Sequence, residues 1–183
     1  KNKASNRTIV IDSDGKIHSR YNKIHLFDVV LSKNEKYLES RTYKAGNKGV
    51  VSKTPFGNMG LTICYDLRFP GLYRDLAKSG AEILFVPSAF TYQTGKDHWH
   101  TLLRARAIET GSFVVAPAQN GVHENGRKTY GHSLVVNPWG EIIAEKKKGI
   151  GLLDFKIDLN EVRKARLKIP SLEGDQLYKV VNK

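Results

Sequence analysis

The chain contains a single cysteine, Cys64, in the stretch LTICYD at residues 61–66. The apolar residues before it are typical of a short buried strand, and a helix is predicted to begin near Asp66. At such a strand-to-helix turn a thiol faces the positive end of a helix dipole, which lowers the thiol pKa and favours the reactive thiolate. The position therefore suits a nucleophile, although free cysteines are also often simply buried.

A nucleophile also needs a base and a group that stabilises a developing oxyanion. The spacing marks none of the six histidines as a partner of the thiol: His18, His25, His98, His100, His123 and His132. His98 and His100 would point to different sides of a helix, so a shared metal site is not expected there. Lys23 has apolar neighbours and is a candidate for a partly buried cation, the alternative being a lysine that reaches solvent.

The elements that position these side chains can be predicted from turn residues and periodicity. Hairpins are expected over 7–21, 49–64 and 131–147, the last with a type I turn at Asn137. Between and after them we expect the following elements: helices from Asp66 to Gly80, from Asp97 to Gly111 with Leu102, Leu103 and Ile108 on its apolar face, and over 161–168; strands over 81–87, 113–117 and 152–159. Apolar strands that alternate with helices are typical of an α/β layered fold.

The composition limits the classes of function. The chain has 183 residues, 40% of them apolar, consistent with a single domain over 1–183. The net charge is +12, but the basic residues are dispersed and not interleaved with aromatic ones, which argues against nucleic acid as a partner. A single cysteine excludes an internal disulfide, and no apolar run could span a membrane. A cytoplasmic protein without a membrane partner is expected.

Five stretches carry a resemblance to a known family. They are, in order, RYNKIHLFD, LTICYDLRFP, GAEILFVPSAF, HWHTLLRARAIET and YGHSLVVNPWGEIIAE. Together they closely resemble the carbon-nitrogen hydrolases of the nitrilase superfamily, and PAQNGVHENGRKTYGHS is most similar to the branch that contains deaminated glutathione amidase. The resemblance implies an αββα sandwich, N-terminally truncated here, and assembly into homodimers or larger homo-oligomers.

The resemblance also implies a Glu-Lys-Cys triad that works without a metal or an organic cofactor. Cys64 matches the nucleophile and Lys23 the catalytic lysine, and the backbone N–H of Tyr65 would join Lys23 in the oxyanion hole. Glu39 matches an additional glutamate that positions the lysine or the substrate, the alternative being an exposed loop glutamate. The family carries its general-base glutamate on a segment that precedes the residues present here, and His100 stands where relatives commonly have a glutamate.

The implied reaction is hydrolysis of the amide in a small linear molecule that also bears a carboxylate, through a cysteine thioester and with release of ammonia. Phe90 and Tyr92 follow the strand ending in FVP and are predicted to line the pocket, with ordinary packing as the alternative. An amide like deaminated glutathione is the first expected substrate, and omega-amidase activity is the second. A truncated, catalytically silent member that acts only in assembly or binding is the third hypothesis.

Overall fold

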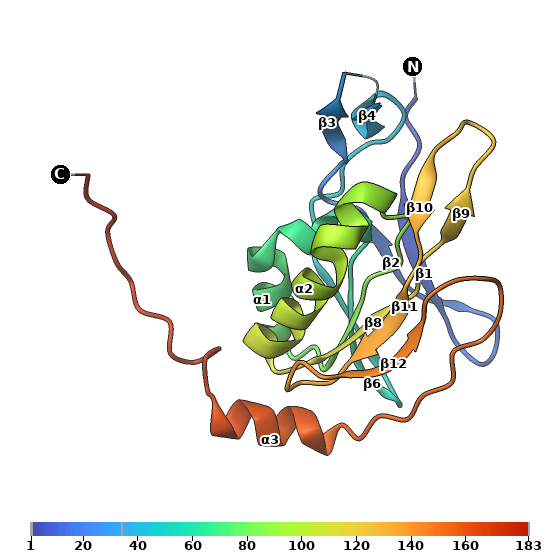
Figure 1. The fold of residues 1–183 in the computed structure, drawn as a ribbon. Coiled ribbons are helices and arrows are strands. Elements are labelled where there is room, and N and C mark those ends of the chain that lie inside the picture. The colour runs from blue at the N-terminus through green and yellow to red at the C-terminus, as the bar shows by residue number, and fades with distance from the viewer. Residues whose placement is uncertain (1, 34, 183) are drawn as a thin grey trace.

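The computed structural model describes residues 2–33 and 35–182. Figure 1 shows a central sheet, two helices side by side over one face of it, and a C-terminal tail that runs away from the body. The strands are β1 (Arg7–Ile11), β2 (Ile17–Asn22), β3 (Asp28–Ser32), β4 (Glu35–Leu38), β5 (Val50–Thr54), β6 (Gly57–Leu61), β7 (Ile83–Phe85), β8 (Phe113–Ala116), β9 (Asn120–Val122), β10 (Lys128–Tyr130), β11 (Ser133–Val136) and β12 (Ile142–Lys146). The helices are η1 (Glu39–Arg41) and η2 (Cys64–Arg68), both 3₁₀, and α1 (Pro70–Lys78), α2 (Tyr92–Thr110) and α3 (Asn160–Lys168).

The main sheet has six strands in the order β12-β11-β8-β7-β6-β5. Strands β6, β7 and β8 are parallel, and the other pairs are antiparallel. Helices α1 and α2 connect the parallel strands, which confirms the predicted α/β class. Because parallel strands end at the same edge, the segments after them meet there: the Cys64 N–H donates to Pro87 O, and the Ser88 N–H donates to Pro117 O.

Apolar side chains cover both faces of this sheet. On the helix side, Trp99 and Leu103 of α2 pack with Leu84 and Val114 of the strands, and all four are fully buried. On the opposite side, Val162 of α3 belongs to a second buried cluster that includes strand residues. Strands with apolar residues on both faces need this double cover to exclude water.

The hairpins expected over 7–21, 49–64 and 131–147 are confirmed as β1–β2, β5–β6 and β11–β12. The Gly140 N–H donates to Asn137 O at 2.9 Å, as a type I turn requires. The main sheet and its hairpins therefore follow closely from alternation and turn chemistry.

Three expectations about element boundaries are wrong. The helix from Asp66 is divided into η2 and α1, because Pro70 lacks an N–H and can only begin a new helix. Helix α2 begins at Tyr92 and not at Asp97, and Ile108, expected on its apolar face, is 53% exposed. Residues 152–159 form no strand: they pair with none of the described strands, and Ile157 and Leu159 pack their side chains on the second cluster instead.

Within the described part of the chain, none of the helices combines the length and the apolar character needed to cross a membrane.

Candidate active site

Cys64 occupies a sharp turn between β6 and η2. Its φ is +49°, one of two positive φ values at non-glycine residues in the described chain, and such backbone conformations are strained for residues with a Cβ atom. The turn holds because the Cys64 N–H donates to Pro87 O at 3.0 Å, beyond the end of β7. The thiol is half-buried at the carboxyl edge of the parallel strands, as the sequence predicts.

The prediction that this turn lowers the thiol pKa is wrong. Burial raises the pKa of Cys64, and the nearby charges of Lys23 and Arg127, together with a hydrogen bond from the Ala89 N–H, lower it only partly. The helix that follows Cys64 is a five-residue 3₁₀ helix, and α1 begins only at Pro70, so little helix dipole acts on the sulfur. The thiol therefore needs a base to become a nucleophile.

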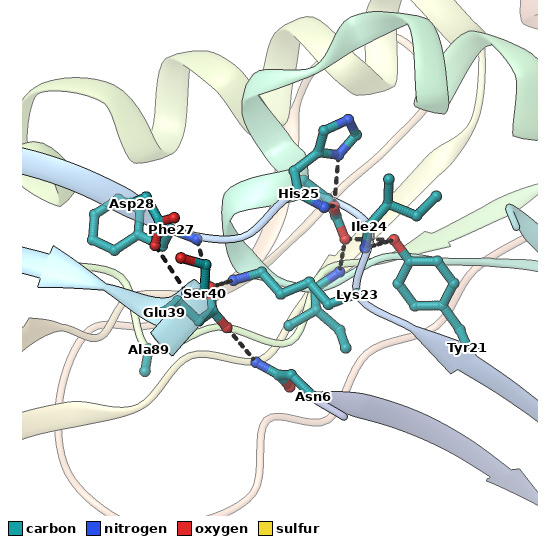
Figure 2. A network of polar contacts seen from close by, with 12 residues as sticks. Asn6, Tyr21, Lys23, Ile24, His25, Phe27, Asp28, Glu39, Ser40 and Ala89 are labelled. Atoms are coloured by element: carbon teal, nitrogen blue, oxygen red, sulfur yellow. Dashed lines mark hydrogen bonds and ion pairs between the residues drawn. The ribbon is translucent and has the colours of Figure 1, made fainter. Parts of the chain in front are cut away.

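Lys23 and Glu39 form a buried ion pair, which Figure 2 shows. The Lys23 side chain is 3% exposed, and its Nζ lies 2.5 Å from Glu39 Oε2. Glu39 also accepts hydrogen bonds from the Phe27 N–H at 2.6 Å and from Asn6 Nδ2 at 2.9 Å. The alternatives of a solvent-reaching lysine and an exposed loop glutamate are therefore wrong.

Glu39 is held in its charged form by these donors. Burial would raise its pKa, but the hydrogen bonds from Lys23, the Phe27 N–H and Asn6 outweigh burial and lower the pKa below its usual value. A carboxylate with a lowered pKa and three bonded donors is a poor proton acceptor. It is well suited to fix the position of the Lys23 ammonium.

Asp66 joins the Lys23 segment to the Cys64 turn, and sequence reasoning missed this role. Its carboxylate is fully buried and accepts from the Tyr21 hydroxyl at 2.7 Å and the Ile63 N–H at 2.8 Å. It also accepts from the His25 N–H at 3.0 Å and pairs with His25 Nδ1 at 2.8 Å. The available signal was an acidic residue directly after a buried strand, where a carboxylate needs several donors.

Tyr65 brings a backbone donor to the same place. No acceptor for the Tyr65 N–H is found in residues 2–33 and 35–182, as expected for the first turn of a helix. Lys23, Cys64 and Tyr65 all line one cavity of about 740 Å³. The cavity thus combines a thiol, an ammonium and an unpaired N–H.

The two aromatic candidates for the pocket wall have different locations. Phe90 is 4% exposed, lines this cavity and packs on Trp99. Tyr92 is 50% exposed and lies outside the cavity lining, at a neighbouring depression. The prediction for Tyr92 is wrong because α2 begins at this residue and carries its ring to the surface beside Tyr130.

His100 belongs to a separate polar cluster. Glu145 Oε1 accepts from His100 Nε2 at 2.9 Å and from His132 Nδ1 at 2.6 Å, which ties α2 to β12. These three are the only group of metal-ligand side chains in close array within the described chain, and none of them lines the thiol cavity. His98 takes no part: its Nδ1 accepts from Arg68 Nη2 at 3.2 Å.

Comparison with known proteins places this arrangement in a family. The family model described as carbon-nitrogen hydrolase matches residues 1–167. The deaminated glutathione amidase of Synechocystis sp. is 47% identical over 173 residues, which is 93% of this chain and 64% of that protein. The chain therefore spans less than two thirds of this relative's length.

Solved structures agree with the sequence comparison. The NitFhit protein of C. elegans superposes with a TM-score of 0.89 at 44% identity, over 95% of this chain and 42% of that one. A mutant amidase from Nesterenkonia sp. AN1, which shows Michael addition of acrylamide at its active site cysteine, has a TM-score of 0.72 at 25% identity, over 90% of this chain and 61% of that one. With its matching sequence, fold and clustered thiol and lysine, the chain belongs to the carbon-nitrogen hydrolase family.

Proposed function

We propose that the protein hydrolyses a carbon-nitrogen amide bond with Cys64 as the nucleophile. The observation that carries the proposal is the shared cavity of the Cys64 thiol, the Lys23 ammonium and the unpaired Tyr65 N–H. The sulfur attacks the amide carbonyl carbon, and Lys23 with the Tyr65 N–H stabilises the negative charge that develops on the carbonyl oxygen. The C–N bond breaks, ammonia leaves, and water hydrolyses the thioester to a carboxylic acid.

The general base is a residue other than Glu39. Because burial raises the pKa of Cys64, the thiol proton must be taken by a carboxylate beside the sulfur and returned to the leaving nitrogen. Glu39 already accepts from Lys23, from Phe27 and from Asn6, and its pKa is lowered. We assign Glu39 to positioning Lys23, and we assign the base to the glutamate that the family carries ahead of the residues matched here.

The substrate we propose is a small linear amide that also bears a carboxylate, of the kind represented by deaminated glutathione. The support is the 47% identity to a protein of that name. Omega-amidase activity is the second candidate, and assays with the two classes of amide would separate them. The third candidate is a catalytically silent module that acts only in assembly or binding. This hypothesis predicts that the protein releases no ammonia from either class of amide.

Replacement of the nucleophile tests the proposed reaction. Cys64→Ala should abolish ammonia release from carboxylate-bearing amides in the natural protein that contains this chain, while circular dichroism stays unchanged. Acrylamide, which adds to the active site cysteine of the Nesterenkonia amidase, should add once to the native protein and not to Cys64→Ala. Ammonia release by Cys64→Ala at the native rate would exclude the mechanism.

Assembly and location remain proposals. We propose a homodimer or larger homo-oligomer in the cytoplasm. The support for assembly is a set of large apolar side chains exposed on the β11–β12 hairpin and on α2: Ile108, Trp139, Ile142 and Ile143. Light scattering would give the oligomeric state, and cell fractionation would give the location.

A further inference from the structure

Arg127 is a cation of the same cavity that the proposed reaction does not use. It precedes β10 on the β9–β10 hairpin and lines the cavity together with Cys64. Its Nη2 donates to the Ala89 carbonyl, and its guanidinium carbon lies 5.2 Å from the centre of the Tyr37 ring. Its Nε is buried, the only buried side-chain nitrogen or oxygen in the described chain without a hydrogen-bond partner. A buried donor on a cation without an acceptor is unfavourable.

No carboxylate within residues 2–33 and 35–182 balances the charge of this guanidinium. No ion pair of Arg127 is found in the described chain. Glu35, at the neighbouring depression, accepts from the Tyr37 hydroxyl at 2.8 Å. Glu39, the carboxylate in the cavity wall, is bound to Lys23 and two further donors. Among the described residues that line the cavity, basic side chains therefore outnumber acidic ones.

Ala89 brings this cation close to the reactive sulfur. Its N–H donates a hydrogen bond to the Cys64 sulfur, while its carbonyl oxygen accepts one from Arg127 Nη2. When the carbonyl carbon of a small amide lies at the sulfur, a second group a few bonds along the same molecule can therefore reach the Arg127 guanidinium. The other cavity cations are less suited, because Lys23 is paired with Glu39 and the exposed Arg7 donates its Nε to Asn22 Oδ1.

We propose that Arg127 binds a carboxylate of the amide substrate and so selects anionic over neutral amides, an inference that rests on the proposed function. The planar guanidinium matches a carboxylate with two parallel hydrogen bonds, which a lysine at the same position could not provide. A small turn of the side chain away from the Ala89 carbonyl would present Nε and one Nη to the ligand. Arg127 is then a specificity-determining residue of the site.

Two alkylating reagents test this proposal without requiring turnover. The deprotonated sulfur displaces iodide from the CH₂ carbon of iodoacetate or iodoacetamide, so that an S–C bond forms as the C–I bond breaks. The sulfur then carries a carboxymethyl or a carbamoylmethyl group, and only iodoacetate bears a carboxylate. Relative to N-acetylcysteine, Cys64 should prefer iodoacetate. In Arg127→Gln that preference should fall about tenfold, the loss expected for one charge-assisted hydrogen bond. Lys128→Gln, which removes an exposed charge from the same hairpin, should leave the preference unchanged.

The outcomes separate this inference from the proposed function. Equal preference in native protein and Arg127→Gln would overturn the role of Arg127 while Cys64 remains a reactive thiol. Absence of labelling by either reagent in the native protein would instead contradict Cys64 as the nucleophile. If Arg127→Gln does not fold, glutarate and glutaramide can be compared as protectants of native Cys64 against iodoacetamide. Glutarate should protect at lower concentration, and equal protection would overturn the proposal.

Discussion

Two carboxylates of this protein each accept several hydrogen bonds, but in different surroundings. Glu39 accepts from Lys23, Phe27 and Asn6, and Glu145 accepts from two histidine rings. In both cases burial would raise the pKa, and the hydrogen bonds lower it below the usual value. Glu39 lies in the wall of the thiol cavity, whereas Glu145 joins helix α2 to the edge strand β12 away from that cavity.

The difference shows that a well-bound carboxylate does not by itself mark an active site. The Glu145 cluster brings together a carboxylate and the two rings that bind it, and it fastens a helix to a sheet. The Glu39 cluster adjoins a cavity in which, among the described residues, the Tyr65 N–H has no acceptor and Arg127 Nε has no hydrogen-bond partner. Polar groups that face the cavity without a described partner distinguish the Glu39 cluster, which we propose is functional, from the Glu145 cluster. The predictions below test that separation, from the largest expected effect to the smallest.

Among the variants that compare the two clusters, Lys23→Ala should give the largest effect on activity. It removes the ammonium that stabilises the oxyanion, and the rate of ammonia release should fall by about 10²- to 10³-fold, as for loss of one oxyanion donor. The matched control is Lys128→Ala, which removes an exposed lysine and should leave the rate unchanged. An unchanged rate in Lys23→Ala would remove Lys23 from the mechanism and weaken the distinction between the two clusters.

Asp66→Asn should give the largest effect on stability. The buried carboxylate accepts hydrogen bonds from Tyr21, Ile63 and His25. The amide of asparagine replaces one accepting oxygen with an NH₂ group, which cannot accept a hydrogen bond from these groups. We expect the free energy of unfolding to fall by about 3 kcal/mol, measured in urea. Asp154→Asn, at an exposed position, is the control. Equal stability of the two variants would show that Asp66 does not hold the Lys23 segment to the Cys64 turn.

The pH dependence of Cys64 alkylation should reflect its raised pKa. Burial disfavours the thiolate, so the alkylation rate by iodoacetamide should rise at higher pH than for a free cysteine. In Lys23→Ala the profile should move to still higher pH, because the cation that favours the thiolate is lost. Glu145→Gln should not move the profile. A native profile below that of free cysteine would contradict burial as the dominant cause.

Glu145→Gln should give the smallest effect, on stability alone. Loss of two hydrogen bonds at a partly exposed carboxylate should cost about 1 kcal/mol in urea unfolding, with Glu124→Gln as an exposed control. Folding lowers the pKa of Glu145. The stabilisation that Glu145 gives to the native protein over Glu145→Gln is therefore fully present above the pKa of this group in the unfolded chain, and it is lost as the pH falls through the pKa in the folded protein. A changed rate of Cys64 alkylation would show that the two clusters are coupled.

The sheet and the place of Cys64 at its edge could be predicted from the sequence, because their signals are local. The turn at Asn137 predicts a hairpin, and the short continuous apolar runs around residues 83 and 113 predict buried strands. Cys64 follows such a strand directly. Lys23 and Glu39 required the family resemblance, since composition around a lysine does not distinguish a buried ammonium from one that reaches solvent.

The remaining features depend on contacts that are distant in sequence. Arg127 lies 38 residues from Ala89, which it contacts, and Asp66 lies 45 residues from Tyr21. No local pattern reports such pairs. The pKa of Cys64 was predicted in the wrong direction because burial, which depends on the whole fold, exceeds the effect of a short 3₁₀ helix. Tyr92 was misplaced because α2 begins five residues before Asp97.

At Cys64 the residue that best suits the backbone differs from the residue that supplies a thiol. A glycine would adopt a φ of +49° without the steric conflict of a Cβ atom, which costs about 1–2 kcal/mol for other residues. A lineage released from the need for this thiol could therefore gain stability by losing it. The strained backbone at Cys64 therefore supports a role for the thiol that glycine could not fill.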